Sequence, residues 1–301
     1  MSGVQVSDQQ LSPTVSRALW AAAEPFALFG LAAPEAHEAM ANLGMPRQSN
    51  FLALRGAPLG KAEPAVLAAA FHGFPRSRFE IHLTPIWQTI EPSDVVDGTH
   101  AVIPVMMNRV FGDSVDRAEL ARQAALLTDL AQTLDTAGRP LAAANQAVTS
   151  PDDPWAKLWR AWTTLREFRG DTHVAELVAH DVTVIEAQVL GALWKGDALD
   201  VEMLRNTRKL DDEVWQRGVA SLQARGLIDS DGALTEAGAA LREEIELRTD
   251  IGCLRAWSQL STADLEAVYS FTLGLSEVLV AGDHMRARTA VGAPWPAPGL
   301  G

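Results

Sequence analysis

The stretch PWAKLWRAWTTLREFRGDTHVAELVAH, residues 154–180, combines the clearest helical pattern of the chain with its densest group of charged side chains. Large apolar side chains recur there every three or four residues, as on one face of a helix; they are Trp155, Leu158, Trp159, Trp162, Leu165 and Phe168. Buried aromatic side chains contribute strongly to a protein core. The pattern therefore predicts a core helix over residues 154–168, ended by Gly170, and a second helix over residues 173–180.

The last third of the chain has the element order of a winged helix. Apolar spacing indicates three helices, over residues 184–194, 203–209 and 210–226. Two short strands around a Ser-Asp-Gly turn are expected within residues 226–238, followed by a helix over residues 240–250. The sequence LQARGLIDSDGALTEAG, residues 222–238, resembles the end of the recognition helix and the wing of MarR-type regulators.

Helical spacing also dominates the first half of the chain, so the predicted fold class is mostly α. We expect a helical N-terminal domain and a winged-helix C-terminal domain that contains a small β-hairpin. The helix expected over residues 262–281 either closes a homodimer or packs on its own core. The predicted parts are a ligand-binding or catalytic domain (12–180), a degenerate winged helix (184–250), packing or dimerising C-terminal helices (251–286) and a disordered tail (287–301).

Composition restricts the compartment and the partners. The single cysteine, Cys253, allows no internal disulfide, and the N-terminus lacks the basic and apolar regions of a signal peptide. No apolar run reaches the roughly 18 residues of a membrane span. We therefore expect a cytoplasmic protein. Its net charge of −13 makes DNA an unlikely partner, because binding to phosphates relies on Lys and Arg.

The winged-helix segment itself is acidic. Residues 195–250 hold eight Lys or Arg and thirteen Asp or Glu, a net charge of −5. The third helix begins Asp211-Asp212-Glu213, and the wing contains Asp229 and Asp231. Acids at a helix N-terminus can serve as caps that favour the helix dipole, but they do not supply the missing cations. We interpret this segment as a scaffold or dimerisation module.

The strongest candidate site follows the tryptophan stripe. His173 is the predicted general base, oriented by Asp171, with Glu167 as a further catalytic carboxylate. Arg166 and Arg169, one helical turn apart, would hold a carboxylate, sulfate or phosphate. The alternative is an ion-paired junction that locks two helices together.

Further binding residues come from elsewhere in the chain. Arg55 lies in a loop rich in Gly and Pro, and Trp162 belongs to the aromatic wall of the expected pocket. Second-tier candidates for the same cavity are Arg47, His72, His82, Arg76 and Glu24. The histidines lack the close spacing of metal ligands, and no dinucleotide, P-loop or hydrolase motif is present. We therefore expect neither a metal nor a cofactor.

Four segments carry a resemblance to a family of uncharacterised actinobacterial helix-turn-helix-like proteins. They read LALRGAPLG, GRPLAAANQAV, LWRAWTTLREFRGDTHVAELV and LQARGLIDSDGALTEAGAALREEIELRTD, and the resemblance spans roughly residues 17–260. The most specific motif is LRE-x-RGD-x-H, residues 165–173. Members of that family tend to carry a His shortly after a Glu-Pro in the first helix. Here the residues from Glu24 to Leu28 contain no His, so a site that needs both histidines would be incomplete.

These observations favour a small-molecule enzyme or binding protein of bacterial specialised (natural-product) metabolism. Its expected chemistry is proton transfer on an anionic substrate: elimination, cyclisation or hydrolysis. A ligand-responsive transcription regulator is the alternative, and it requires the cations Arg205, Arg208, Lys209 and Arg217 to gather on one face. A sequestering or resistance protein without turnover is the third hypothesis.

Overall fold

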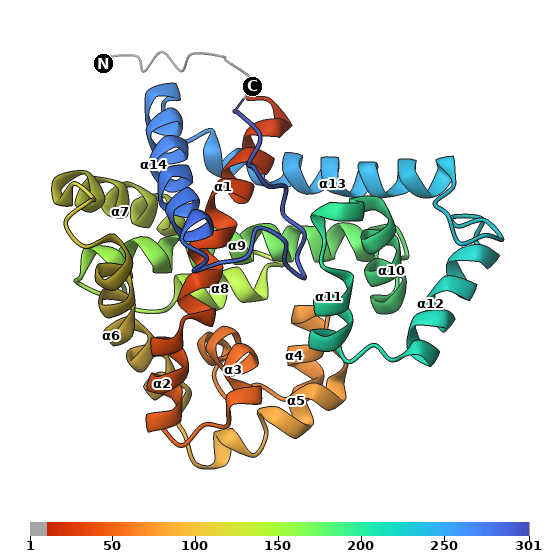
Figure 1. The fold of residues 1–301 in the computed structure, drawn as a ribbon, viewed down its shortest axis with the longest axis horizontal. Helices are drawn as coiled ribbons and strands as arrows, with labels where there is room; N and C mark the ends of the chain where they lie inside the picture. The colour runs from red at the N-terminus through yellow and green to blue at the C-terminus, as the bar shows by residue number, and fades with distance from the viewer. Residues whose placement is uncertain (1–10, 301) are drawn as a thin grey trace.

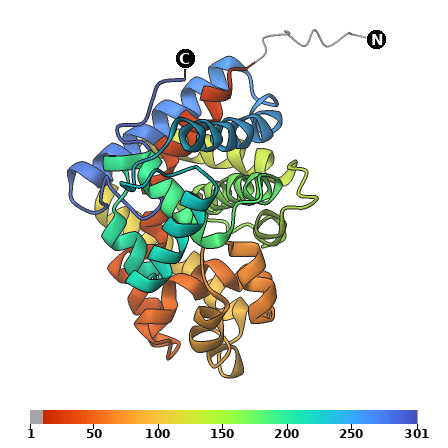
Figure 2. The same cartoon turned by 90° about the vertical axis from the view of Figure 1, so that its right-hand side faces the viewer.

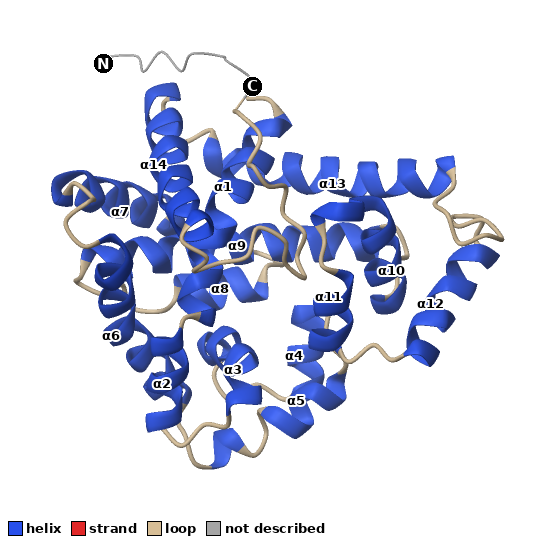
Figure 3. Cartoon of the chain, viewed as in Figure 1, coloured by secondary structure: helices blue, strands red, loops and turns tan. Residues whose placement is uncertain are grey.

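The computed structural model describes residues 11–300, which form helices joined by loops (Figure 1). No strand is assigned among these residues (Figure 3), and the mostly α fold class is confirmed. The polar residues 1–10 lie outside the described part. The α-helices are α1 (Pro13–Ala32), α2 (Pro34–Asn42), α3 (Asn50–Gly56), α4 (Pro64–Phe71), α5 (Arg76–His82), α6 (Pro92–Phe111), α7 (Arg117–Gln132), α8 (Pro140–Gln146), α9 (Pro154–Ala179), α10 (Val184–Lys195), α11 (Val201–Arg208), α12 (Asp212–Ala224), α13 (Glu236–Trp257) and α14 (Thr262–Ala281).

Local capping chemistry sets where many of these helices begin. Ser12 caps α1 and is followed by a proline, whose fixed φ suits the first helical position. Asp153 accepts hydrogen bonds from the backbone N–H groups of the first turn of α9. Thr183 and Glu186 form a reciprocal capping box at the start of α10. These caps satisfy backbone donors that would otherwise lack partners.

The helix α9 runs through the middle of the molecule (Figure 1) and is continuous over 26 residues. The predicted break at Gly170 is wrong. Gly170 does not adopt the left-handed φ that ends helices, and the Thr172 hydroxyl donates to the Phe168 carbonyl across it at 2.8 Å. Packing on several sides holds the helix through the glycine, since α9 contacts α1, α7, α8 and α13. The predicted burial of the tryptophan stripe is confirmed, because all three tryptophans are at most 2% exposed.

The two largest hydrophobic cores of the described residues share the helix α13. The larger core joins α1–α9 with the C-terminal half of α13 and with α14. The smaller core joins α10, α12 and the start of α13. The predicted boundary after residue 250 therefore falls inside one helix, α13, that belongs to both cores. The helix α14 begins and ends as predicted, and it packs on α1 of its own chain.

The helices α10, α11 and α12 follow one another as expected for a helix-turn-helix, and we call them the helix-turn-helix unit. The β-hairpin predicted after α12 is reduced to one antiparallel bridge between Ile228 and Leu234. The turn itself forms, with Asp229 accepting from the backbone of Asp231 and Ala233. The second strand cannot lengthen, because the next residue, Thr235, already caps α13.

The C-terminal segment, expected to be disordered, makes specific contacts over residues 287–300. The Asp200 backbone N–H donates to the Thr289 carbonyl at 3.1 Å, and Lys195 Nζ donates to the Val291 carbonyl at 2.6 Å. The Tyr269 hydroxyl donates to the Pro298 carbonyl at 2.8 Å. Figure 2 shows this segment folded back against the helices rather than extending from them.

Among the described residues, no single helix has the length and apolar composition of a membrane span. The helices α9 and α10 meet that criterion only when taken as a pair, across a bend of 107°.

Candidate functional site

A cavity of about 220 Å³ lies between α9 and the helices α10 and α11 of the helix-turn-helix unit. Arg55 of α3 and the residues at the end of α4 close another side of it. Its wall carries six cationic side chains and two carboxylates, an excess of four positive charges before histidines are counted. The charged residues of the wall are Arg55, Arg166, Arg169, Lys195, Arg208, Arg242, Glu167 and Glu246. In a chain of net charge −13, this concentration of cations is the reverse of the average.

One group of wall residues forms a chain of buried ion pairs that joins α1, α3 and α9. Glu167 receives two hydrogen bonds from Arg55, at 2.9 and 2.7 Å, and a third from Arg166 at 3.2 Å. Arg166 also binds Glu24 through two hydrogen bonds, at 2.9 and 2.7 Å. Although burial opposes ionisation, the two guanidinium groups hold the pKa of Glu167 below its usual value. Glu167 is therefore an ionised, fully occupied carboxylate rather than a proton donor.

A second group of ion pairs joins α9 to α13. Arg169 contacts Glu246 at 3.0 Å and Asp250 at 2.7 Å. Glu246 also accepts from Arg242, one turn earlier in α13, at 2.5 Å. These side chains are at most 9% exposed, and the surrounding cations hold the pKa of Glu246 well below its usual value despite its burial. The predicted alternative, an ion-paired junction that locks helices together, describes these residues well.

Two cations of the wall have no carboxylate partner within the described residues. Arg208 of α11 stacks over the Phe74 ring at 3.7 Å, and its Nε has no hydrogen-bond partner. Burial, together with the nearby Arg55 and Arg166, lowers the pKa of Arg208 to about 9. Lys195, at the end of α10, donates only to a backbone carbonyl. Burial also lowers its pKa, to about 8. Charges that lack a partner in a cavity are costly unless a ligand neutralises them.

His173 also lies on the cavity wall, and its tautomer follows from its neighbours. The Thr249 hydroxyl donates to the Ile245 carbonyl at 2.7 Å, so it accepts from His173 Nδ1, 3.0 Å away. The other ring nitrogen, Nε2, then carries a lone pair and has no hydrogen-bond partner in the described part of the chain. Burial lowers the pKa of His173 to about 3, so the ring is neutral at physiological pH.

Asp171 does not orient His173, contrary to the prediction. In a continuous helix, residues two positions apart point to nearly opposite sides. Asp171 faces α8, where it accepts from the Ala142 backbone N–H at 2.8 Å and caps that helix. Burial raises its pKa to about 7 even though this hydrogen bond favours the ionised form.

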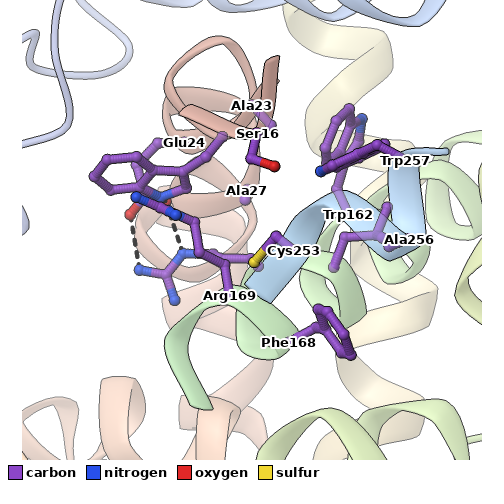
Figure 4. A pocket seen from close by; sticks show the side chains of 13 residues that line it. Ser16, Ala23, Glu24, Ala27, Trp162, Phe168, Arg169, Cys253, Ala256 and Trp257 are labelled. Atoms are coloured by element: carbon purple, nitrogen blue, oxygen red, sulfur yellow. Dashed lines mark hydrogen bonds and ion pairs between the residues drawn. The ribbon is translucent and has the colours of Figure 1, made fainter. Parts of the chain in front are cut away.

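Trp162 lies away from the cavity. It borders a separate void of about 20 Å³ between α1, α9 and α13, close to Trp257 and the buried thiol of Cys253 (Figure 4). That volume holds no more than a water molecule or two. Glu24 lines this void, and Trp20, Arg166 and Arg169 line both the void and the larger cavity.

The other predicted residues divide in the same way. Arg55, Arg166, Glu167, Arg169 and His173 lie on the cavity wall, together with His72. Arg47 is exposed, Arg76 pairs with Glu80 on the surface and His82 contacts Arg78. Three cavity residues were not predicted from the sequence: Lys195, Arg242 and Glu246. Arg208 was predicted only as a possible contact to DNA.

The outer face of the helix-turn-helix unit is acidic. Asp212 and Glu213, at the start of α12, are 93% and 85% exposed. They pair with Arg205 at 2.5 Å and with Arg217 at 2.6 Å. Because Arg208 faces the cavity, Lys209 is the one cation of the predicted DNA-contacting group that is exposed without an acidic partner in the described structure.

Residues 11–300 contain no group of three or more His, Cys, Asp or Glu side chains arranged to hold a metal ion. Residues 16–286 match the model of a family described as a helix-turn-helix family. Neither the curated proteins nor the solved structures contain a match.

Proposed function

Since the chain belongs to the helix-turn-helix family, and since Lys195 and Arg208 of its helix-turn-helix unit face a cavity, we propose that it binds an anionic small molecule there. The observation that carries this proposal is Arg208, a guanidinium directed into the cavity with no carboxylate beside it. A bound carboxylate, sulfate or phosphate would supply the missing partner through charge-assisted hydrogen bonds.

We propose that the ligand belongs to bacterial specialised metabolism and that the chemistry is proton transfer. His173 is the base in this proposal, because the lone pair of its Nε2 is free and the ring is neutral. Its low pKa makes it a weak base while the cavity is empty. An anion bound nearby would raise that pKa towards neutrality, so the substrate itself would activate the base. Glu167 serves to position Arg55 and Arg166, and no cofactor is needed.

The MarR-like part of the proposal gives the helix-turn-helix unit a structural role. The order of α10, α11 and α12, the turn at Asp229 and the bridge at Ile228 support a winged helix with a minimal wing. Its first two helices, rather than its recognition helix, supply cavity residues. This arrangement supports a scaffold that closes one side of the cavity.

Calorimetric titration tests the proposal, with inorganic phosphate, sulfate, acetate and succinate as probes. We expect at least one anion to bind, and Arg208→Gln to weaken that binding by about tenfold or more, the effect of a lost charged hydrogen bond. Arg205→Gln is the matched control, since Arg205 lies on the same helix but pairs with Asp212. Absence of binding, or equal weakening by both variants, would overturn the proposal.

A ligand-responsive regulator is the second candidate, favoured by the description of the family. It predicts salt-sensitive binding to duplex DNA. A sequestering protein without turnover would share the anion site. His173→Ala separates it from an enzyme in a metabolite screen, because an enzyme would lose turnover and keep its ligand, whereas a pure binder has no turnover to lose.

A further inference from the structure

Lys195 differs from the other lysines of the chain. Only four are present, at positions 61, 157, 195 and 209. Lys61 pairs with Glu91 at 2.6 Å, and Lys209 is exposed. Lys195 instead reaches the cavity, where Nζ lies 5.5 Å from the Trp20 ring centroid and donates to the Val291 carbonyl at 2.6 Å. No carboxylate lies within 4 Å of this nitrogen in the described structure, so no fixed anion holds it in its charged form.

The surroundings of Lys195 make its ammonium group easier to deprotonate than that of an exposed lysine. Glu246 is the carboxylate with the strongest electrostatic effect on Lys195, and it already accepts hydrogen bonds from Arg169 and Arg242. Burial lowers the pKa of Lys195 to about 8, although Glu246 raises it. The charged and titratable groups that act on it come from α1, α9 and α13; they are Glu24, Arg169, His173, Arg242 and Glu246. A lysine beside other cations in a partly dry pocket is the usual form of an amine nucleophile.

We propose that Lys195 is an amine nucleophile that forms an iminium with the carbonyl carbon of an oxo acid bound in the cavity. The inference rests on the proposed anion site, and it names the substrate class as a carboxylate that also carries an aldehyde or ketone. Arg208 holds the carboxylate in this arrangement, since its guanidinium lacks a partner on the same cavity wall.

The step balances without a further reactant. Lys195 first gives one proton of its ammonium group to a base, and the neutral nitrogen attacks the carbonyl carbon. A proton moves from nitrogen to the former carbonyl oxygen, giving a carbinolamine. The C–O bond then breaks with uptake of the first proton, so oxygen leaves as water and the nitrogen retains one hydrogen in the iminium. His173, which lines the same cavity, holds the first proton and returns it once the bound carboxylate has raised the pKa of its ring.

Reductive trapping of the full-length protein tests this inference. Wild-type protein is incubated with glyoxylate and sodium cyanoborohydride at pH 7.5, and the alkylated lysines are located by peptide mass mapping. We expect Lys195 to be alkylated about tenfold faster than the other three lysines, with a rate that saturates with glyoxylate and falls when succinate competes. Arg208→Gln should slow alkylation at Lys195 and leave the other lysines unchanged.

Two variants complete the test. Lys195→Arg keeps the positive charge and should abolish the fast alkylation, whereas Lys157→Arg should leave it unchanged. Alkylation that follows solvent exposure, with Lys209 faster than Lys195, would overturn the inference. The wild-type map alone decides this, so the test survives a variant that fails to fold.

Failure of this inference is distinct from failure of the anion site. If calorimetry shows binding that depends on Arg208 while Lys195 is not trapped, the iminium is excluded and the anion site stands. If no anion binds and all four lysines react alike, both proposals are overturned.

Discussion

The two sides of the helix-turn-helix unit carry opposite charge. On the outer face, where a recognition helix would approach DNA, Asp212 and Glu213 are 93% and 85% exposed. On the inner face, Lys195 and Arg208 line a cavity without acidic partners. The acids of the outer face favour the dipole of α12, and they pair with Arg205 of α11 and Arg217 of α12. The difference teaches that the unit directs the positive charge of Lys195 and Arg208 towards the cavity and presents negative charge to the outside.

The largest contrast in stability should appear between the buried ion pairs of the cavity wall and the exposed ion pairs of the outer face. Glu167→Gln leaves Arg55 and Arg166 buried beside a neutral group and should lower the free energy of unfolding by about 3–5 kcal/mol. Glu213→Gln, which disrupts an exposed pair on α12, should cost less than about 1 kcal/mol. Urea denaturation of both variants measures the difference. Similar costs would show that the inner pairs are solvated and not locked.

Two glycines of the unit make the next comparison. A Cβ at Gly218 of α12 would lie 2.7 Å from Ile185 Cγ1 and 2.9 Å from Val189 Cγ2, so Gly218→Ala should destabilise by up to about 3 kcal/mol. A Cβ at Gly191, on the cavity wall, would meet only Arg242 Nε, at 4.0 Å. Gly191→Ala should therefore be neutral or stabilising by up to about 1 kcal/mol. Thermal unfolding checks both, and a costly Gly191→Ala would show that the cavity is closed in solution.

The pH dependence of stability tests the neutral state of His173. Its pKa in the folded chain, about 3, lies below the unfolded value near 6.5, so the unfolded chain binds the proton first. The contribution of His173 to stability should then fall as the pH drops from 6.5, by about 2 kcal/mol at pH 5. Asp171 acts in the opposite direction, because its folded pKa of about 7 favours the protonated folded state as the pH drops towards 4.

Urea denaturation at pH 7 and pH 5 separates the two groups. His173→Gln should reduce the loss of stability on acidification, whereas Asp171→Asn should increase it. If His173→Gln leaves the change in the free energy of unfolding between pH 7 and pH 5 unaltered, the ring of His173 is protonated in the folded protein.

The smallest expected effect on stability concerns Arg208. Replacing a half-buried cation that has no partner should raise the free energy of unfolding by up to about 1 kcal/mol in Arg208→Gln, even as anion affinity falls. Arg205→Gln on the outer face should change neither quantity appreciably. Loss of stability in Arg208→Gln, measured by thermal unfolding without ligand, would mean that its stacking on Phe74 outweighs the cost of its charge.

Much of the helical framework was predictable because its signals are local. The tryptophan stripe of α9 follows helical periodicity, and α14 begins and ends at the predicted residues. The wing was only partly predictable. Its turn residues are local signals, but the cap at Thr235 competes with the second strand.

The site was predictable only where its residues lie close together in the sequence. Arg166, Glu167, Arg169 and His173 lie within two turns of one helix, and they were found together. Lys195, Arg208 and Glu246 reach the cavity from α10, α11 and α13, and only long-range packing shows their association. Asp171 was misplaced because the helix continues through Gly170, which directs its side chain towards α8. Trp162 was misplaced because it lies one turn before Arg166, at the smaller void.

The most direct test of the account is a titration of purified full-length protein with fluorescent duplex DNA at low salt, repeated at rising salt. The account predicts no binding to random or genomic upstream duplexes, because the outer face is acidic and Arg208 faces the cavity. Micromolar or tighter binding that weakens steeply with salt would contradict it, since such binding requires several cations on the surface to contact phosphates.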